Sequence, residues 1–335
     1  MKPIYFLLPN NLAERTSLQQ FGFLLLFISA SLLFYNLLAP LLVLLAGYSI
    51  DLLREPKLSS LSSNEILLLK LFQVGGGIFV FVFPTLLFEY LMRHSGEKNY
   101  LCLQTVPLPV HIGKVLLVIP LILPLIVWLA YINENLTLPA VFQYIETWVR
   151  ESEREAGKMI RAFLKMQNIG QLLFNLLVMA VLPALGEELL FRGCIQQIFQ
   201  RGLRNPHLAI WLAGALFSFI HFQFLGFLPR MAVGIILGYL FYYSGNLWLP
   251  ILVHFLYNGF QVCLVYIHQN EIINGFPETN NPFSDMPYGI LTPLLLIFLS
   301  VGTLWYLLPS FRQQMPKYGI ADTKLNTNDT YPGNS

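Results

Sequence analysis

Residues 181–199 read VLPALGEELLFRGCIQQIF, and the interpretation of the whole chain depends on this stretch. Two adjacent glutamates, Glu187 and Glu188, and one arginine, Arg192, stand between two apolar runs. Charged side chains are costly in apolar surroundings and are retained there mainly when they pair with one another or carry a function. The first question is therefore what these three charges do in sequence that resembles a membrane-spanning segment.

The composition of the chain is that of a membrane protein. It has 335 residues, of which 56% are hydrophobic and 11% charged, with a mean hydropathy of +0.60. Soluble domains carry about 25% charged and roughly 45–50% apolar residues. The net charge of +2 and the lack of a basic block argue against a nucleic-acid partner. The three cysteines have no paired spacing, which excludes a disulfide framework and a zinc ribbon.

Apolar segments that can cross a bilayer recur along the chain. A spanning helix needs about 20 mainly apolar residues. We expect such helices at residues 21–48, 66–92, 115–132, 166–186, 206–222, 231–243, 247–268 and 288–308. In this interpretation GEELLFRG ends the fourth span or directly follows it. The sequence predicts an all-α fold, a polytopic membrane helical bundle with about eight transmembrane helices.

Composition divides the chain into four regions. Residues 1–165 combine N-terminal transmembrane helices with an amphipathic connecting helix at about 140–165, which fits either the membrane interface or a solvated connection. Residues 166–270 form the expected catalytic core, and residues 271–308 contain the C-terminal transmembrane helix. Residues 309–335 are polar and rich in Asn, Thr, Pro and Gly, which predicts a disordered tail.

Three pairs of residues in the second half are each separated by four positions. This spacing places the members of a pair on one face of a helix. The pairs are Glu188 with Arg192, Phe217 with His221, and His254 with Asn258. Glu187 lies about 100° around the helix from Glu188, so it can reach a different partner.

The spacings suggest a division of roles. Arg192 can neutralise Glu188, because two carboxylates side by side in a low dielectric would otherwise not both stay charged. Glu187 then has no cation of its own and is the candidate general base. His221 and His254 are expected beside it, and the asparagine four residues after His254 supplies an amide N–H that can stabilise an oxyanion.

Each feature also has a purely structural interpretation. A Glu–Arg pair can join helices, a single helical histidine is most often a packing residue, and an HxxxN pair can simply bond two helices. Phe217 is expected to pack and at most to shape the site. The functional interpretation depends on convergence, because two acids, an arginine, two histidines and an asparagine fall within about 70 residues of apolar chain.

Together the motifs resemble those of a known family. GEELLFRG matches EExxxR, Phe217–His221 matches FxxxH, and His254–Asn258 matches HxxxN/B. In this order they resemble the CPBP family of intramembrane proteases, which includes the eukaryotic CAAX prenyl endopeptidase and bacterial Abi proteins. The resemblance covers about residues 166–262, and the first 165 residues carry no comparable signature.

The resemblance implies a role for each motif position. The catalytic glutamate of the family corresponds to Glu187, which is expected to activate water together with His221. The pair thought to hold the oxyanion of the tetrahedral intermediate corresponds to His254 and Asn258. The positions with supporting or substrate-positioning roles are Glu188, Arg192 and Phe217.

The family is often described as a metalloprotease family, which raises the question of a cofactor. If a metal binds, its candidate ligands are Glu187, His221 and His254, with one open position for water. The chain lacks HExxH, the familiar helix-borne zinc motif. A water held by Glu187 and His221 needs no metal. The expectation is therefore either no required cofactor or one divalent metal such as zinc.

The leading expectation is an integral-membrane endopeptidase that cleaves a peptide bond at or within the bilayer, with CAAX-type processing as the family's precedent. The alternative is a non-catalytic membrane scaffold, immunity factor or chaperone of the same fold. A transporter with a proton relay is a third interpretation, but the two related halves that would favour it are not visible. The expected partners are membrane lipid and a peptide or membrane-protein substrate, without nucleic acid. The expected location is the cell (plasma) membrane, crossed several times.

Overall fold

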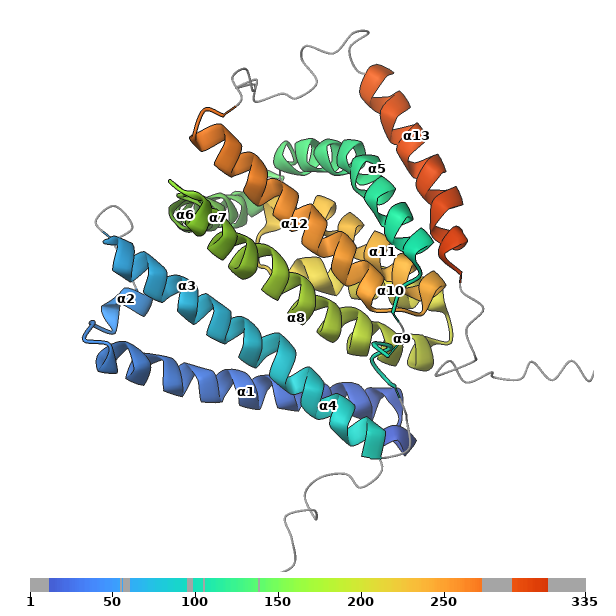
Figure 1. The fold of residues 1–335 in the computed structure, drawn as a ribbon, viewed down its shortest axis with the longest axis horizontal. Helices are drawn as coiled ribbons and strands as arrows, with labels where there is room; N and C mark the ends of the chain where they lie inside the picture. Colours follow the sequence, from blue (N-terminus) through green and yellow to red (C-terminus); the bar gives the residue numbers. More distant parts are fainter. Residues whose placement is uncertain are drawn as a thin grey trace, which may run out of the picture.

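The computed structural model describes residues 12–54, 56, 61–94, 99–104, 106–137, 139–272 and 291–312. Every regular element within these residues is helical (Figure 1). The helices of the first half are α1 (Ser17–Leu45), α2 (Asp51–Arg54), α3 (Ser63–Gly77), α4 (Phe83–His94), α5 (Pro109–Glu134) and α6 (Gln143–Phe163). Those of the second half are α7 (Ile169–Leu176), α8 (Leu182–Leu190), α9 (Gln196–Leu203), α10 (Pro206–Phe219), α11 (Phe227–Ser244), α12 (Trp248–Gln269) and α13 (Leu291–Leu307).

Short irregular helical turns connect these elements. Three are π-helical and continue the helices on either side of them: η3 (Ile78–Val82), η5 (Leu177–Val181) and η6 (Phe191–Ile195). The 3-10 turns are η2 (Leu12–Glu14), η4 (Ala140–Phe142), η7 (Phe224–Gly226) and η8 (Leu308–Phe311).

Seven helical stretches in the described part are long and apolar enough to cross a membrane. They are Ser17–Leu45, Ser63–Arg93, Pro109–Glu134, Ile169–Leu203, Phe224–Ser244, Trp248–Gln269 and Leu291–Phe311. The remaining expected span, the fifth, at residues 206–222, corresponds to α10, which is apolar but has only 14 residues. That is about 21 Å of helix against a hydrocarbon core of about 30 Å. The prediction of an all-α, polytopic membrane bundle is confirmed.

The structure corrects the expected end of the fourth span. Instead of ending near Gly186, the helix runs without interruption from Ile169 to Leu203, and GEELLFRG lies inside it. Backbone groups in apolar surroundings have no water to bond, so a continuous helix is the conformation that satisfies them. The charges of the motif are accommodated because Glu188 and Arg192 bond each other.

Three further boundaries differ from expectation. Helix α10 ends at Phe219, so His221 lies in the turn that follows it. The span expected at 231–243 begins earlier, and α11 includes Arg230. The ordered chain also continues past residue 309, because Phe311 is fully buried in η8; residues 313–335 of the expected tail lie outside the described residues.

Two prolines explain where two of the π-helical turns fall. Pro84 follows η3 and Pro183 follows η5. Proline has no N–H and its ring crowds the carbonyl of the preceding turn, so the helix has to widen and a carbonyl loses its partner. Side chains from neighbouring helices bond such carbonyls: Ser31 bonds the carbonyl of Phe79, and the carbonyl of Met179, four residues before Pro183, accepts from α12.

The core helix α7–α9 is covered on two sides. In Figure 1, α3 runs beside α8 on one side and is continued there by η3, while α1 lies below them in the view and packs on η3, α4 and α9. Helix α12 lies on the other side of α8, and α5 packs against α11, α12 and α13. Large apolar side chains on the outer helices are exposed, for example Leu37 at 70% and Trp305 at 82%. Such surfaces suit contact with lipid rather than water.

The predicted amphipathic segment is α6. Its charges form ion pairs along the helix, such as Arg154 with Glu151 at 2.5 Å, while its last residue, Phe163, is buried. Glu153 of α6 accepts a 2.9 Å hydrogen bond from the backbone of Leu225 in η7. The helix is thus packed on the core, and its location at the membrane interface stays a prediction.

Candidate active site

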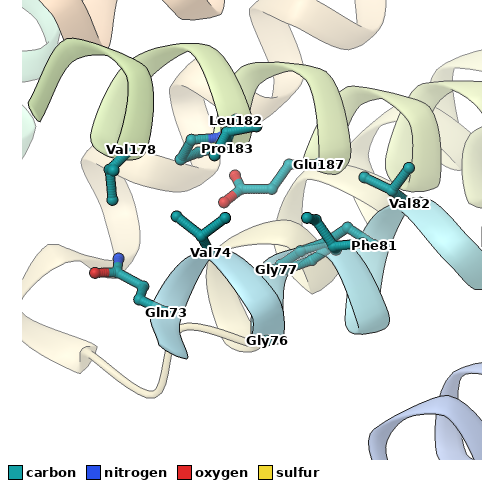
Figure 2. A pocket seen from close by; sticks show the side chains of 11 residues that line it. Gln73, Val74, Gly76, Gly77, Phe81, Val82, Val178, Leu182, Pro183 and Glu187 are labelled. Atoms are coloured by element: carbon teal, nitrogen blue, oxygen red, sulfur yellow. The ribbon is translucent and has the colours of Figure 1, made fainter. Parts of the chain in front are cut away.

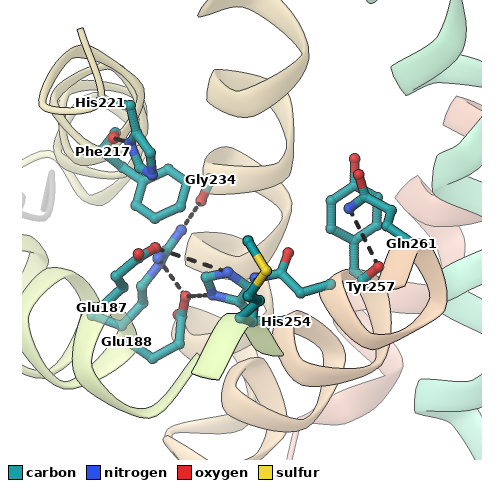
Figure 3. A network of polar contacts seen from close by, with 11 residues as sticks. Glu187, Glu188, Phe217, His221, Gly234, His254, Tyr257 and Gln261 are labelled. Atoms are coloured by element: carbon teal, nitrogen blue, oxygen red, sulfur yellow. Dashed lines mark hydrogen bonds and ion pairs between the residues drawn. The ribbon is translucent and has the colours of Figure 1, made fainter. Parts of the chain in front are cut away.

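Glu188 is the centre of a buried polar network (Figure 3). Its side chain is fully buried, and its Oε1 accepts hydrogen bonds from Arg192 Nη1 at 2.7 Å and from His254 Nδ1 at 2.8 Å. The first contact is the i,i+4 pair that the sequence predicts. The second joins α8 to α12 across 66 positions of sequence. Glu188 therefore holds two of the other motif residues in place.

Arg192 fixes a third helix. Its Nη2 donates a 2.8 Å hydrogen bond to the carbonyl of Gly234 in α11, and its guanidinium lies 4.8 Å from the centre of the Phe217 ring. One turn further along, Gln196 donates a 3.0 Å hydrogen bond to the carbonyl of Gly238. Both carbonyls are accessible because glycine has no side chain to cover them, and the two contacts clamp α11 onto the motif helix.

Phe217 acts as the packing centre of the site. It is 2% exposed, and its ring meets the rings of Phe191, His221 and His254 edge-on, with centroids 5.2, 5.3 and 5.9 Å away. These are the favoured aromatic geometries. Phe217 is thus packed among the rings of the site, and its role in shaping the site stays a prediction.

Glu187 lies at the edge of this network, which it meets through a long contact with His254 (Figure 3). Its carboxylate is turned toward α3 and η3, where Val74 and Phe81 face it (Figure 2). The only ion-pair partner within reach in the described part of the chain is His254, whose Nε2 lies 3.9 Å from Glu187 Oε2. This is longer than a hydrogen bond. Glu187 is 9% exposed, so it is a buried carboxylate without a directly bonded cation.

His221 is positioned by the turn after α10. Its Nδ1 lies 2.8 Å from the carbonyl oxygen of Phe217, which can only accept, so Nδ1 is the protonated nitrogen and Nε2 is the acceptor of the neutral ring. The next residue, Phe222, has a left-handed φ of 51°. Asn133 of α5 bonds the carbonyl of Phe224 at 2.8 Å and so ties down this turn. The Phe217 carbonyl therefore orients the His221 ring, and the turn that carries His221 is tied to α5.

Asn258 lies one turn after His254 on α12. Its Nδ2 donates a long hydrogen bond of 3.4 Å to the carbonyl of Met179, whose usual i+4 donor position is taken by Pro183, a residue without an N–H. A bond of this length is weak. The amide is therefore oriented by the neighbouring helix, but it can exchange this contact for a better acceptor.

The expected catalytic residues line one cavity of about 500 Å³. Glu187, His221, His254 and Asn258 all contribute to its wall, and they come from α8, the turn after α10, and α12. Since α8 and α12 are 66 positions apart at the Glu188–His254 contact, only the folded bundle brings these groups together. A volume of this size is in the range of small-molecule and short-peptide sites.

Glu187 also lines a second cavity of about 260 Å³. The wall of this cavity is mainly apolar and is formed by η3 and the end of α3 on one side and by η5 and α8 on the other (Figure 2). The candidate base thus lies between two mainly apolar cavities, of which the larger also carries the two histidines, Asn258 and Arg230, while the smaller is lined by no other acid or base.

Sequence reasoning missed Arg230, which lines the larger cavity with the expected catalytic residues. A span that starts at residue 231 leaves this arginine in the loop before it. A proline is tolerated in the first turn of a helix, so Pro229 is the signal that could have placed the helix start earlier and Arg230 inside it.

A second missed feature joins α3, α6 and α7. Lys70 is 7% exposed and donates a 2.8 Å hydrogen bond to Asn175 Oδ1, while Asn175 Nδ2 donates to the carbonyl of Phe163 at 2.9 Å. The signal in the sequence is a lysine and an asparagine inside two expected spans, since polar residues in spans tend to find one another. They lie outside both cavity walls.

The geometry does not suit a metal site. Among the described residues, no group of three His, Cys, Asp or Glu side chains lies close enough to hold a metal ion. His221 and His254 both bond through Nδ1, to the Phe217 carbonyl and to Glu188, so Nε2 is the ring nitrogen that each turns to other partners. In this arrangement Glu187, His221 and His254 do not come together as a three-ligand group.

Fold and site together define a class: a polytopic helical membrane protein with carboxylate, histidine and amide groups around a buried cavity. Residues 169–260 match the family model described as "Type II CAAX prenyl endopeptidase Rce1-like". The resemblance inferred from the motifs is confirmed for this segment, which contains every motif position. This segment is therefore similar to a family of proteases.

A protein of Bacillus subtilis (strain 168), named "Uncharacterized protein YpbD", is 28% identical over 95 residues. The matched region is 27% of this chain and 46% of the relative, so the chain spans about half the length of that protein. No solved structure matches the chain.

Proposed function

We propose that this protein is an endopeptidase that hydrolyses a peptide bond at or within the bilayer. The observation that carries the proposal is the common cavity: Glu187, His221, His254 and Asn258 line one space of about 500 Å³. A general base, a water-binding imidazole and amide donors are the groups that peptide hydrolysis needs. The match of this segment to an endopeptidase family supports the same reaction.

The proposed reaction begins with a water between Glu187 and His221. Glu187 takes a proton from the water, His221 Nε2 accepts a hydrogen bond from it, and the water oxygen attacks the carbonyl carbon of the peptide. The negative charge that develops on the carbonyl oxygen is stabilised by Asn258 Nδ2 and His254. The C–N bond then breaks while the proton moves from Glu187 to the leaving nitrogen, which yields a carboxylic acid and an amine. The acid passes its remaining proton to the amine, so the products leave as a carboxylate and an ammonium group.

The supporting residues restrict what His254 can do. Because the Glu188 carboxylate accepts, His254 Nδ1 carries a proton. For Nε2 to donate to the oxyanion as well, the ring has to carry both protons, so the proposed role requires the imidazolium form during the reaction. Glu188 then faces two cations, Arg192 and His254, and acts as their common anchor.

The second cavity suggests how the substrate approaches. Its mainly apolar wall next to Glu187 suits an aliphatic or lipid-like part of the substrate, while the larger cavity offers polar groups to the peptide. We therefore propose CAAX-type processing of a peptide or membrane-protein substrate, with membrane lipid as the surrounding partner. Similarity to a bacterial protein supports the cell (plasma) membrane as the location.

The test is cleavage of a peptide library by the purified full-length protein in liposomes. The library contains lipidated and unlipidated members, and wild type is compared with Glu187→Ala. Cleavage by the wild type that is lost in the folded variant is expected. Equal cleavage by both proteins would contradict the role of Glu187 as the base or point to a contaminant. No cleavage by either protein across the library would contradict the proposal and favour a non-catalytic scaffold.

A further inference from the structure

The larger cavity contains one cation that the proposed reaction does not use. Arg230 is the single lysine or arginine among the residues that line this cavity. It is half-buried in the first turn of α11, and it lines the same cavity as Glu187 and the two histidines. An arginine at this depth calls for a partner or a function.

The guanidinium of Arg230 is held in place by a turn of the chain. Its Nη1 and Nη2 donate hydrogen bonds to Gln223, at 3.3 Å to the backbone carbonyl and 2.9 Å to Oε1. Gly226 leaves room for it, because a Cβ there would lie 2.5 Å from Nη2. The turn itself is tied to α5 through Asn133 and to α6 through Glu153. Arg230 is therefore a positioned group rather than a freely moving surface side chain.

Arg192 is bonded directly to a carboxylate, and within the described residues Arg230 is not. Arg192 bonds the carboxylate of Glu188 at 2.7 Å, whereas both hydrogen bonds of Arg230 within the described residues go to the uncharged Gln223. Glu153 and Glu187 act on it only through longer-range electrostatics. A guanidinium with unused N–H donors in a cavity wall is a binding site for an anion, and it matches a carboxylate best because it can donate two parallel hydrogen bonds.

We propose that Arg230 binds the carboxyl-terminal carboxylate of the substrate and thereby selects peptides that are cut close to their C-terminus. This inference rests on the proposed peptidase function. Glu187 and Arg230 line the same cavity of about 500 Å³, which holds only a short peptide segment. A terminal carboxylate on Arg230 therefore places a nearby peptide bond at Glu187. Arg230 is a specificity residue in this account and takes no part in bond breaking.

The test is a binding measurement in the Glu187→Gln protein, so that it does not depend on turnover. Three fluorescent peptides are compared in neutral-lipid nanodiscs. The first has a free C-terminal acid, the second is the C-terminal amide of the same sequence, and the third is an amide whose last residue is replaced by glutamate. We expect the acid to bind on the order of tenfold more tightly than either amide. The additional change Arg230→Gln should abolish this difference, and Arg230→Lys should retain part of it. Arg154→Gln, an exposed arginine on α6, is the matched control.

Several results would overturn the proposal. The first is equal affinity of the Glu187→Gln protein for the acid and the plain amide. The second is an Arg230→Gln change that weakens the binding of both peptides by the same factor. The third is no measurable binding of any peptide. Tight binding of the glutamate-bearing amide would assign Arg230 to side-chain carboxylates instead. Loss of anionic phospholipid binding in Arg230→Gln, with peptide binding unchanged, would assign it to lipid.

The same measurement separates this proposal from the peptidase function. Wild type that cleaves acid and amide peptides equally, combined with equal binding, leaves the peptidase standing and removes the role of Arg230. If the protein cleaves no peptide but still binds the acid selectively through Arg230, the carboxylate site stands and the peptidase function is removed. If Arg230→Gln in the otherwise wild-type protein lowered only kcat, and equally for acid and amide substrates, Arg230 would be an oxyanion group. That result would contradict the inference.

Discussion

His254 and Arg192 bond the same carboxylate oxygen of Glu188, His254 through Nδ1 at 2.8 Å and Arg192 through Nη1 at 2.7 Å. One buried oxygen therefore connects the motif helix to α12. Arg192 extends the connection to α11 through the carbonyl of Gly234. The geometry of the cavity depends on this junction, because α8, α11 and α12 all contribute to its wall.

The change Arg192→Met tests the structural weight of this junction. It leaves the fully buried Glu188 without its cation and the Gly234 carbonyl without its donor. We expect a loss of about 3–5 kcal/mol in the free energy of unfolding, measured by denaturant titration in micelles. The double variant Glu188→Gln/Arg192→Met should recover part of the loss. Arg154→Met on the exposed face of α6 should change stability little, and a similarly small effect of Arg192→Met would contradict this account.

The close approach of α11 to its neighbours predicts a steric effect at Gly238. A Cβ at this position would lie 2.9 Å from both Gln196 Oε1 and Ile210 Cγ2. The change Gly238→Leu should therefore destabilise the protein by about 1–3 kcal/mol through overpacking. The control is Gly302→Leu in α13, where nothing lies within 4 Å of the added carbon. Equal thermal stability of the two variants would show that α11 does not pack as described.

The proposed oxyanion role of Asn258 predicts a defect in catalysis rather than in binding. Asn258→Ala should lower kcat by about 10²–10³-fold with little change in KM, because the interaction strengthens only as charge develops. The comparison is steady-state kinetics against Asn270→Ala, which changes an asparagine just beyond α12 and outside the cavity. If Asn258→Ala raised KM and left kcat unchanged, Asn258 would bind substrate instead.

The donor geometry also predicts the response to metal removal. Because the candidate ligands do not form a three-residue group, activity should persist after incubation with a strong chelator, and purified active protein should contain far less than one zinc per chain. The measurements are residual peptidase rate and elemental analysis of the same sample. Stoichiometric zinc together with a chelator-induced loss that zinc restores would replace the proposed mechanism with a metal-dependent one.

The sequence predicts best what depends on local spacing. The i,i+4 rule identifies the contact between Glu188 and Arg192, and runs of apolar residues identify the helices. Local spacing gives the wrong helix boundary where a helix continues through residues that usually end one. Gly186 suggests the end of a helix, but the helix continues through it. The glycine has a packing role instead, since a Cβ at Gly186 would lie only 3.0 Å from Phe81 Cβ.

Contacts between helices are beyond local reasoning. The bond from His254 to Glu188 and that from Gln196 to Gly238 depend on how α8, α9, α11 and α12 cross, and no periodicity within one segment encodes a crossing. Arg230 is missed for a different reason, since its place in the cavity follows from a helix that begins a few residues earlier than its apolar run.

The most direct test of the central claim is the rate of peptide cleavage in Glu187→Gln under single-turnover conditions. The amide replaces the carboxylate at nearly the same volume but cannot take a proton from water. The account predicts a rate lower by about 10³-fold or more, with substrate affinity and thermal stability close to wild type. A rate within a few fold of wild type in the same preparation would contradict the assignment of Glu187 as the base, and with it the proposed mechanism.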